Sequence, residues 1–206
     1  MNGHYSSGET VFGNWVLGRL LGQGSYGKVF EAQRVDYGMT YRAAVKIITV
    51  PQSRDEIVSA HTEGMTDQNV TDYFRNMVEQ IVQEIALMGE LDGAPNIVSY
   101  KDHAVIPHQG EIGWDILIRM ELLTPLLQRI EEAPLTEPEI VKLGIHMCRA
   151  LELCEAKKII HRDIKPENIF VSSTGDYKLG DFGVARTVDR TSGGLSKKRH
   201  LYLHGS

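Results

Sequence analysis

The chain carries two kinds of hydrophobic pattern, one typical of strands and one typical of helices. Short apolar runs rich in β-branched and aromatic residues occupy 15–21, 29–32, 41–48, 97–100 and 114–121. Runs of this length favour strands, and the glycine-rich turn after the first run favours an antiparallel meander. Between Phe74 and Met88 the apolar residues instead recur at three- and four-residue steps. This spacing predicts a helix over 67–91 with one buried face.

The second half of the chain is mainly helical in pattern. Thr136 stands where a helix cap is expected and Pro138 at a first-turn position, and apolar residues follow at helical spacing as far as Leu153. A small antiparallel sheet with one helix, joined to a mostly helical part, predicts an α+β fold with two lobes. We expect a loose polar arm over 1–13, a first lobe over 14–121, a hinge at 121–124 and an incomplete second lobe over 124–198.

Two motifs in the second half carry candidate chemistry. Residues 161–168 read His-Arg-Asp-Ile-Lys-Pro-Glu-Asn, and Asp-Phe-Gly follows at 181–183. Together they supply a base, Asp163, for an attacking hydroxyl and two oxygen ligands for Mg²⁺, Asn168 and Asp181. A turn with solvated charges is the alternative for the first motif alone. The second motif, with a lysine and a glycine-rich loop upstream in the right order, favours phosphoryl transfer.

At these residues the chain resembles the protein kinase family, from about Trp15 to about Lys198. The resemblance implies a two-lobe kinase fold and transfer of the γ-phosphate of ATP to a protein hydroxyl, with ATP and Mg²⁺ as cofactors. Lys165 is typical of serine/threonine kinases, in which it reaches the transferred phosphate. Arg162 beside Asp163 implies control by phosphorylation of the activation loop. The available acceptors there are Thr187, Thr191, Ser192 and Ser196.

The nucleotide site that the resemblance implies lies upstream of both motifs. A glycine-rich turn between two strands lets the backbone approach phosphates, although a tight hairpin alone also needs glycines. Lys46 stands among apolar residues and needs an anionic partner if it is buried. Glu84 is expected to be that partner, with Glu79 and Glu90 as competitors. The residues expected to contact the nucleotide are Leu21, Gly22, Gly24, Gly27, Val29, Ala44, Lys46, the gatekeeper Met120, Phe170, and the backbone of Glu121 and Leu123.

The composition indicates the class of protein, its expected partners and its compartment. The chain is 42% hydrophobic and 24% charged, which is ordinary for a soluble globular protein. Its net charge of −5 gives no basic footprint, so nucleic acid is not an expected partner. No signal peptide or spanning segment stands out, and we expect a cytoplasmic protein. The spacing of Cys148 and Cys154 places them on different faces of one helix, so no internal disulfide is expected.

The end of the chain departs from the family. After Asp-Phe-Gly the chain lacks the Ala-Pro-Glu segment and the later helices that the resemblance implies. Residues 199–206 resemble nothing in the family, yet a one-base shift of a possible coding sequence reads Gly-Thr-Tyr-Thr-Tyr-Met-Ala-Pro. We therefore expect 199–206 to be a frameshift product, with a cloning scar or a genuine alternative end as the alternative. The chain as written is expected to have little kinase activity. The other functions considered are a non-catalytic nucleotide-binding or interaction module and a small-molecule phosphotransferase.

Overall fold

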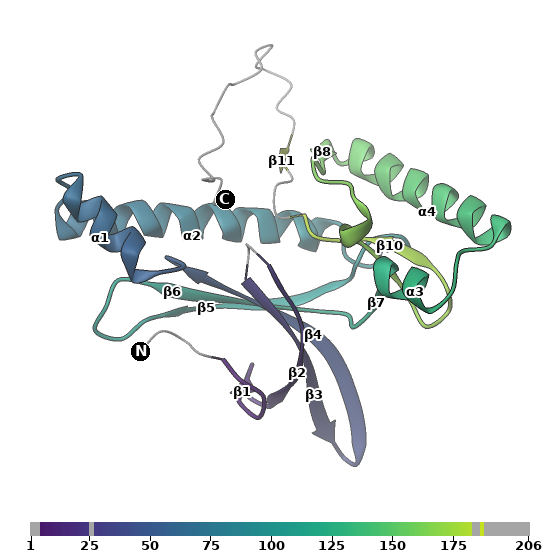
Figure 1. Cartoon of the computed structure of the whole chain (residues 1–206), viewed down its shortest axis with the longest axis horizontal. Helices are drawn as coiled ribbons and strands as arrows, with labels where there is room; N and C mark the ends of the chain where they lie inside the picture. Colours follow the sequence, from purple (N-terminus) through teal and green to yellow (C-terminus); the bar gives the residue numbers. More distant parts are fainter. Residues whose placement is uncertain (1–4, 25–26, 183–185, 188–206) are drawn as a thin grey trace, which may run out of the picture.

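The structure is a computed structural model that describes residues 5–24 and 27–182, and the backbone of 186–187. A curled antiparallel sheet with a long helix running across it lies beside a smaller, mainly helical part (Figure 1). This arrangement confirms the expected α+β fold with two lobes. The lobes meet at residues 121–123, between the last strand of the large sheet and the first element of the helical part.

The large sheet has the order β1-β2-β3-β4-β6-β5, and each neighbouring pair is antiparallel. Strand β4 lies inside the sheet, and its apolar residues Ala43, Val45 and Ile47 are buried. The face that they share is covered by residues near the N-terminus, among them Val11 and Trp15. The strands are β1 (Thr10–Val11), β2 (Trp15–Gly24), β3 (Gly27–Asp36), β4 (Met39–Val50), β5 (Tyr100–Pro107) and β6 (Trp114–Met120).

The predicted long helix is present as α2 (Asp67–Glu90). Thr66 caps it, because its side chain accepts a hydrogen bond from the amide of Asn69 at 3.3 Å. The apolar stripe of α2, which includes Val70, Phe74 and Val78, packs against Ile116 and Ile118 of β6. A shorter helix, α1 (Arg54–Thr62), precedes α2 and was not predicted. The first lobe therefore has one helix more than expected.

Two segments of the first lobe differ from their predicted form. The strand expected at 97–100 begins only at Tyr100, because Ile97 and Val98 lie along the second lobe, where the Val98 amide donates to the Leu179 carbonyl at 2.9 Å. The arm expected to be loose over 1–13 includes β1, which pairs with β2. Val11 is buried in this arm, and Tyr5 and Phe12 pack on the same core. Burial of these apolar side chains stabilises the packing of residues 5–12 on the sheet.

The second lobe begins directly after the hinge and is built around helix α4. The expected cap is present: the Glu139 carboxylate accepts hydrogen bonds of 2.8 Å from the amide nitrogen and the hydroxyl of Thr136. Short strands form two small sheets, β10-β9-β7 and β11-β8. The elements are β7 (Thr124–Pro125), α3 (Leu126–Glu132), α4 (Glu137–Ala156), β8 (Ile159–Ile160), a 3-10 turn (Pro166–Asn168), β9 (Ile169–Val171), β10 (Tyr177–Leu179) and β11 (Arg186–Thr187).

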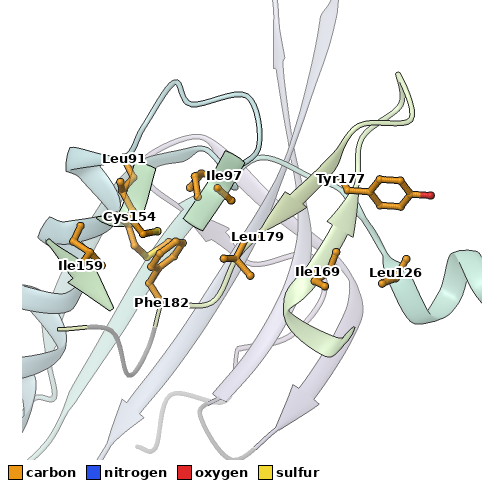
Figure 2. Close-up of a cluster of buried hydrophobic side chains, with 11 residues drawn as sticks. Leu91, Ile97, Leu126, Cys154, Ile159, Ile169, Tyr177, Leu179 and Phe182 are labelled. Carbon is orange, nitrogen blue, oxygen red and sulfur yellow. The ribbon is translucent and has the colours of Figure 1, made fainter. Parts of the chain in front are cut away.

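One hydrophobic core crosses from the first lobe into the second. Figure 2 shows Leu91 and Ile97, which follow α2, in the same cluster as Leu179 and Phe182 of the second lobe. Cys154 is buried in this cluster, burial raises the pKa of its thiol, and both cysteines are free. In the part of the chain that the structure describes, no helix is long and apolar enough to cross a bilayer.

Candidate active site

The register of the large sheet brings the expected nucleotide residues onto one face. Lys46 of β4 pairs with Val29 of β3, and Ala44 of β4 pairs with Met120 of β6. Residues that pair directly across neighbouring strands point to the same side of a sheet, and so do alternate residues along a strand. The side chains of Val29, Ala44, Lys46 and Met120 therefore share the face opposite to the one that carries Val45.

The glycine-rich turn joins the ends of β2 and β3, where Gly24 pairs with Gly27. Gly27 has a φ of +116°, and a Cβ at this position would collide with the carbonyl oxygen of Ile47. Gly27 is therefore required by the packing of the sheet itself. Cβ atoms at Gly22 and Gly24 would meet nothing within 4 Å among the described residues, so packing does not require these glycines. Ser25 and Tyr26, between Gly24 and Gly27, lie outside the described residues.

The ammonium group of Lys46 is paired with Asp181 of the second motif. Its Nζ donates to Asp181 Oδ1 at 2.9 Å, and the Lys46 side chain is only 14% exposed. The expected ion pair between Lys46 and Glu84 is not formed among the described residues, where the carboxylate on Lys46 is that of Asp181. Glu84 is half-buried on α2, whereas its competitors Glu79 and Glu90 are exposed. Glu84 is thus the acid of this group that the fold turns inward.

Asp163, the expected base, is held by two neighbours in its own loop. Its Oδ2 lies 2.9 Å from Lys165 Nζ and accepts a hydrogen bond of 3.0 Å from Asn168 Nδ2, which also donates to the Asp163 carbonyl at 2.7 Å. The hydrogen bond from Lys165 lowers the pKa of Asp163, with a further contribution from Asn168, while partial burial acts in the opposite direction. The same bond raises the pKa of Lys165. The contacts with Lys165 and Asn168 therefore favour the ionised form of Asp163.

His161 joins the two motifs, a role that the sequence did not reveal. Its Nε2 lies 3.0 Å from the carbonyl oxygen of Gly180, so this nitrogen must carry the proton, and its Nδ1 accepts from the Asp163 amide at 3.3 Å. The ring is 2% exposed, and burial lowers its pKa, which keeps the imidazole neutral in this arrangement. It packs edge to face on Phe182, with ring centroids 4.6 Å apart. The position in the first motif was visible in the sequence, but its partners were not.

Gly180 allows the second motif to approach the first. Its amide donates to the Asn168 carbonyl at 2.9 Å. A Cβ here would lie 2.6 Å from Cγ2 of Val98 and 3.0 Å from Cε2 of Phe170. Both distances are shorter than the separation of about 3.5–4.0 Å that carbon atoms prefer. The backbone on either side of this contact region is unusual, because Arg162 and Asp181 have φ angles of 69° and 55°. Left-handed backbone in non-glycine residues costs energy and is concentrated at functional sites.

Asn168 and Asp181 supply oxygen atoms of the kind that Mg²⁺ prefers. Asn168 is 4% exposed, and since its amide nitrogen donates to Asp163, the amide oxygen is the atom that a hard cation would bind. Among the described residues there is no group of three or more His, Cys, Asp or Glu side chains that could hold a metal by itself. Mg²⁺ in phosphoryl-transfer sites takes only one or two protein ligands beside phosphate oxygens and water. The donors present fit such a site.

The remaining expected contacts border this group. Glu121 and Leu123 are half-buried in the hinge, and Leu21 of β2 is 36% exposed. Phe170 of β9 pairs with Pro125 directly after the hinge. Of the expected phosphorylation sites, Thr187 is described only by its backbone in β11, and Thr191, Ser192 and Ser196 lie outside the described residues together with the tail at 199–206.

The chain is similar in sequence to known protein kinases. Residues 15–200 match the family described as the protein kinase domain. CBL-interacting protein kinase 4 of Oryza sativa subsp. japonica is 30% identical over 88% of this chain and 35% of its own length. Cyclin-dependent kinase 20 of Danio rerio is 29% identical over 83% of this chain and 42% of its own length. Serine/threonine-protein kinase PknH of Mycobacterium tuberculosis is 30% identical over 85% of this chain and 24% of its own length. The chain spans less than half the length of these relatives.

Proposed function

Because the chain belongs to the protein kinase family, we propose that it acts as a serine/threonine protein kinase, which transfers the γ-phosphate of ATP to a hydroxyl group of a protein. The observation that supports this most directly is the group around Asp163, in which Lys165 lies 2.9 Å and Asn168 3.0 Å from one carboxylate oxygen. Names of relatives such as PknH and CBL-interacting serine/threonine-protein kinase 5 support the serine/threonine class.

The proposed roles follow from the charges at the site. ATP with Mg²⁺ would supply the phosphoryl group and the positive charge that stabilises its transfer. Lys46 would leave Asp181 to hold phosphate oxygens, and Asp181 with Asn168 would hold the metal. Lys165 would turn from Asp163 to the transferred phosphate. Asp163, without its ion pair, would then accept the proton of the attacking hydroxyl at its Oδ2.

A non-catalytic nucleotide-binding fragment is the second candidate. The observation that favours it is that both carboxylates at the site are already neutralised within the chain, Asp181 by Lys46 and Asp163 by Lys165, each at 2.9 Å. Phosphoryl transfer depends mainly on positioning, and an error of about 1 Å can cost on the order of 10²-fold in rate. Turnover of the chain as it stands is therefore expected to be weak even if nucleotide binding is retained.

Calorimetry with Mg·ATP and a transfer assay on a generic protein substrate separate these functions. Lys46→Ala should remove nucleotide binding, whereas Asp163→Asn should keep binding and abolish any transfer. Lys142→Ala is the matched control, because Lys142 lies on α4 and is not among the residues of the site. Its Nζ is ion-paired with Asp176 at 3.1 Å. Binding that survives Lys46→Ala contradicts the assignment of the site. Transfer that survives Asp163→Asn contradicts the role of the base.

A further inference from the structure

The side chain of Glu121 has no part in the proposed chemistry, yet it bonds to two other segments of the chain. Its Oε1 accepts a hydrogen bond of 2.6 Å from the Ser99 amide and one of 2.7 Å from Lys178 Nζ. The Ser99 carbonyl in turn accepts from the Glu121 amide at 3.0 Å. The exposed fractions of the Lys178 and Glu121 side chains are 14% and 22%. Short charge-assisted bonds in a mostly buried setting are stronger and more specific than ordinary surface contacts.

These bonds connect the hinge to the strand that leads into the second motif. Lys178 lies on β10, and the loop 96–99 runs along the same strand: the Leu179 amide donates to the Asn96 carbonyl at 2.9 Å, and Asn96 Nδ2 donates to the Tyr177 carbonyl at 3.0 Å. Figure 2 shows Ile97 of this loop and Leu179 of β10 in the same core cluster. The hinge, the loop and β10 are therefore held together as one unit.

We propose that Glu121 and Lys178 form a clamp that positions the adenine end of the nucleotide site relative to its metal end. The proposal rests on the proposed function, because the clamp acts through the hinge backbone and through Asp181. Three residue steps, at most about 10 Å of chain, separate Lys178 from Asp181, so a displacement of β10 from the hinge would also displace that carboxylate. Glu121 and Lys178 are positioning residues and touch neither phosphate nor metal.

Two other ion pairs of the second lobe differ in their geometry or exposure. Lys142 and Asp176 are 41% and 44% exposed, and exposed pairs of this kind contribute little. The pair of Arg129 with Glu139 is similarly short, at 2.8 Å, and its side chains are 28% and 32% exposed. It joins α3 to α4, and among the described residues the bonds of Arg129 go to Ala133 and Glu139 rather than to the hinge or β10. Arg129→Met is therefore a matched control for Lys178→Met.

The test compares a ligand that uses one end of the site with a ligand that uses both. Adenosine needs only the hinge, whereas the non-hydrolysable ATP analogue AMP-PNP with Mg²⁺ needs the hinge and Asp181. We expect Lys178→Met to change the adenosine affinity less than about twofold and to reduce the additional affinity of Mg·AMP-PNP by about five- to tenfold, which lies within the range of coupling between contacting residues. Arg129→Met should change neither. Glu121→Gln, which keeps an acceptor for the Ser99 amide, should reproduce the loss.

The outcomes separate the clamp from a general structural role and from the proposed function. A parallel loss of affinity for both ligands in Lys178→Met and Glu121→Gln overturns the clamp. Wild-type protein that binds neither ligand overturns the proposed function instead. In that case amide hydrogen exchange on the free protein tests the clamp: faster exchange at 121–123 in Lys178→Met than in Arg129→Met supports it, and equal exchange overturns it.

Discussion

Replacement of Gly180 by alanine tests how closely the backbone before the second motif packs on Val98 and Phe170. The added Cβ would lie 2.6 Å from Val98 Cγ2 and 3.0 Å from Phe170 Cε2, whereas carbon atoms prefer separations of about 3.5–4.0 Å. The neighbours must therefore move by about 1 Å. Overpacking of this kind typically costs about 1–3 kcal/mol of unfolding free energy. For a domain of this size, 1 kcal/mol corresponds to a change in Tm of about 2–4 °C.

The assay is urea unfolding of the purified chain, with thermal unfolding as a second measurement. Gly144→Ala is the control, because Gly144 is exposed on α4 and a Cβ there meets nothing within 4 Å. It should raise the unfolding free energy by about 0.5–1 kcal/mol, since alanine is the better helix former. Opposite signs at the two glycines would separate a steric contact from the general preference for alanine.

The contact partner can be tested in the same series. Val98→Ala removes the methyl group that the new Cβ would strike, so the double variant should lose less stability than the sum of the single losses, by about 1 kcal/mol. Gly180→Ala as stable as wild type would show that Gly180 packs less closely on Val98 than the 2.6 Å distance implies. Strict additivity with Val98→Ala would show that Val98 is not the contact.

Two further predictions concern pH and the cap of α4. Burial lowers the pKa of both His161 and His146, so the unfolded chain binds more protons than the folded one; stability is full above about pH 6.5 and should fall as pH decreases below it. His146→Gln should reduce this loss of stability, as measured by urea unfolding at several pH values. A free energy of unfolding that increases as the pH is lowered from 7 to 5 would contradict the prediction. Glu139→Ala should cost about 1 kcal/mol through loss of the capping box, whereas Glu155→Ala, near the helix C-terminus, should cost nothing. Equal melts for these two variants would show that the cap is not stabilising.

Elements with a strong local signal could be predicted from the sequence. Helix α2 has apolar residues at helical spacing over most of its length, and it was predicted within one residue of its bounds, Asp67–Glu90. The start of α4 carries its own signals, a capping Thr136 and an early Pro138. Helix α1 has no such signal, since residues 54–62 are mostly polar and only Ala60 of this helix is buried. Its position depends on packing that a sequence pattern does not record.

Features that depend on distant partners could not be predicted. Ile97 and Val98 have the apolar, β-branched character of a strand, but their neighbour is Leu179, far along the chain. The resemblance implies a role only for the backbone of Glu121. Its side chain accepts a hydrogen bond from Lys178, which is 57 residues away in the sequence, and no local pattern indicates this contact. Glu84 is the expected partner of Lys46 because of its position on the helix. In the structure the fold brings Asp181 close to Lys46, and these two residues form the ion pair.

Two lysine–carboxylate pairs balance the charges within the site. A lysine that is mostly buried, as Lys46 is at 14% exposure, needs an anion, and the Asp181 carboxylate supplies it. Lys46 pairs with Asp181, and Lys165 pairs with Asp163 and lowers the pKa of that carboxyl. Phosphate oxygens would compete for both lysines, and Mg²⁺ would compensate the Asp181 charge that Lys46 leaves.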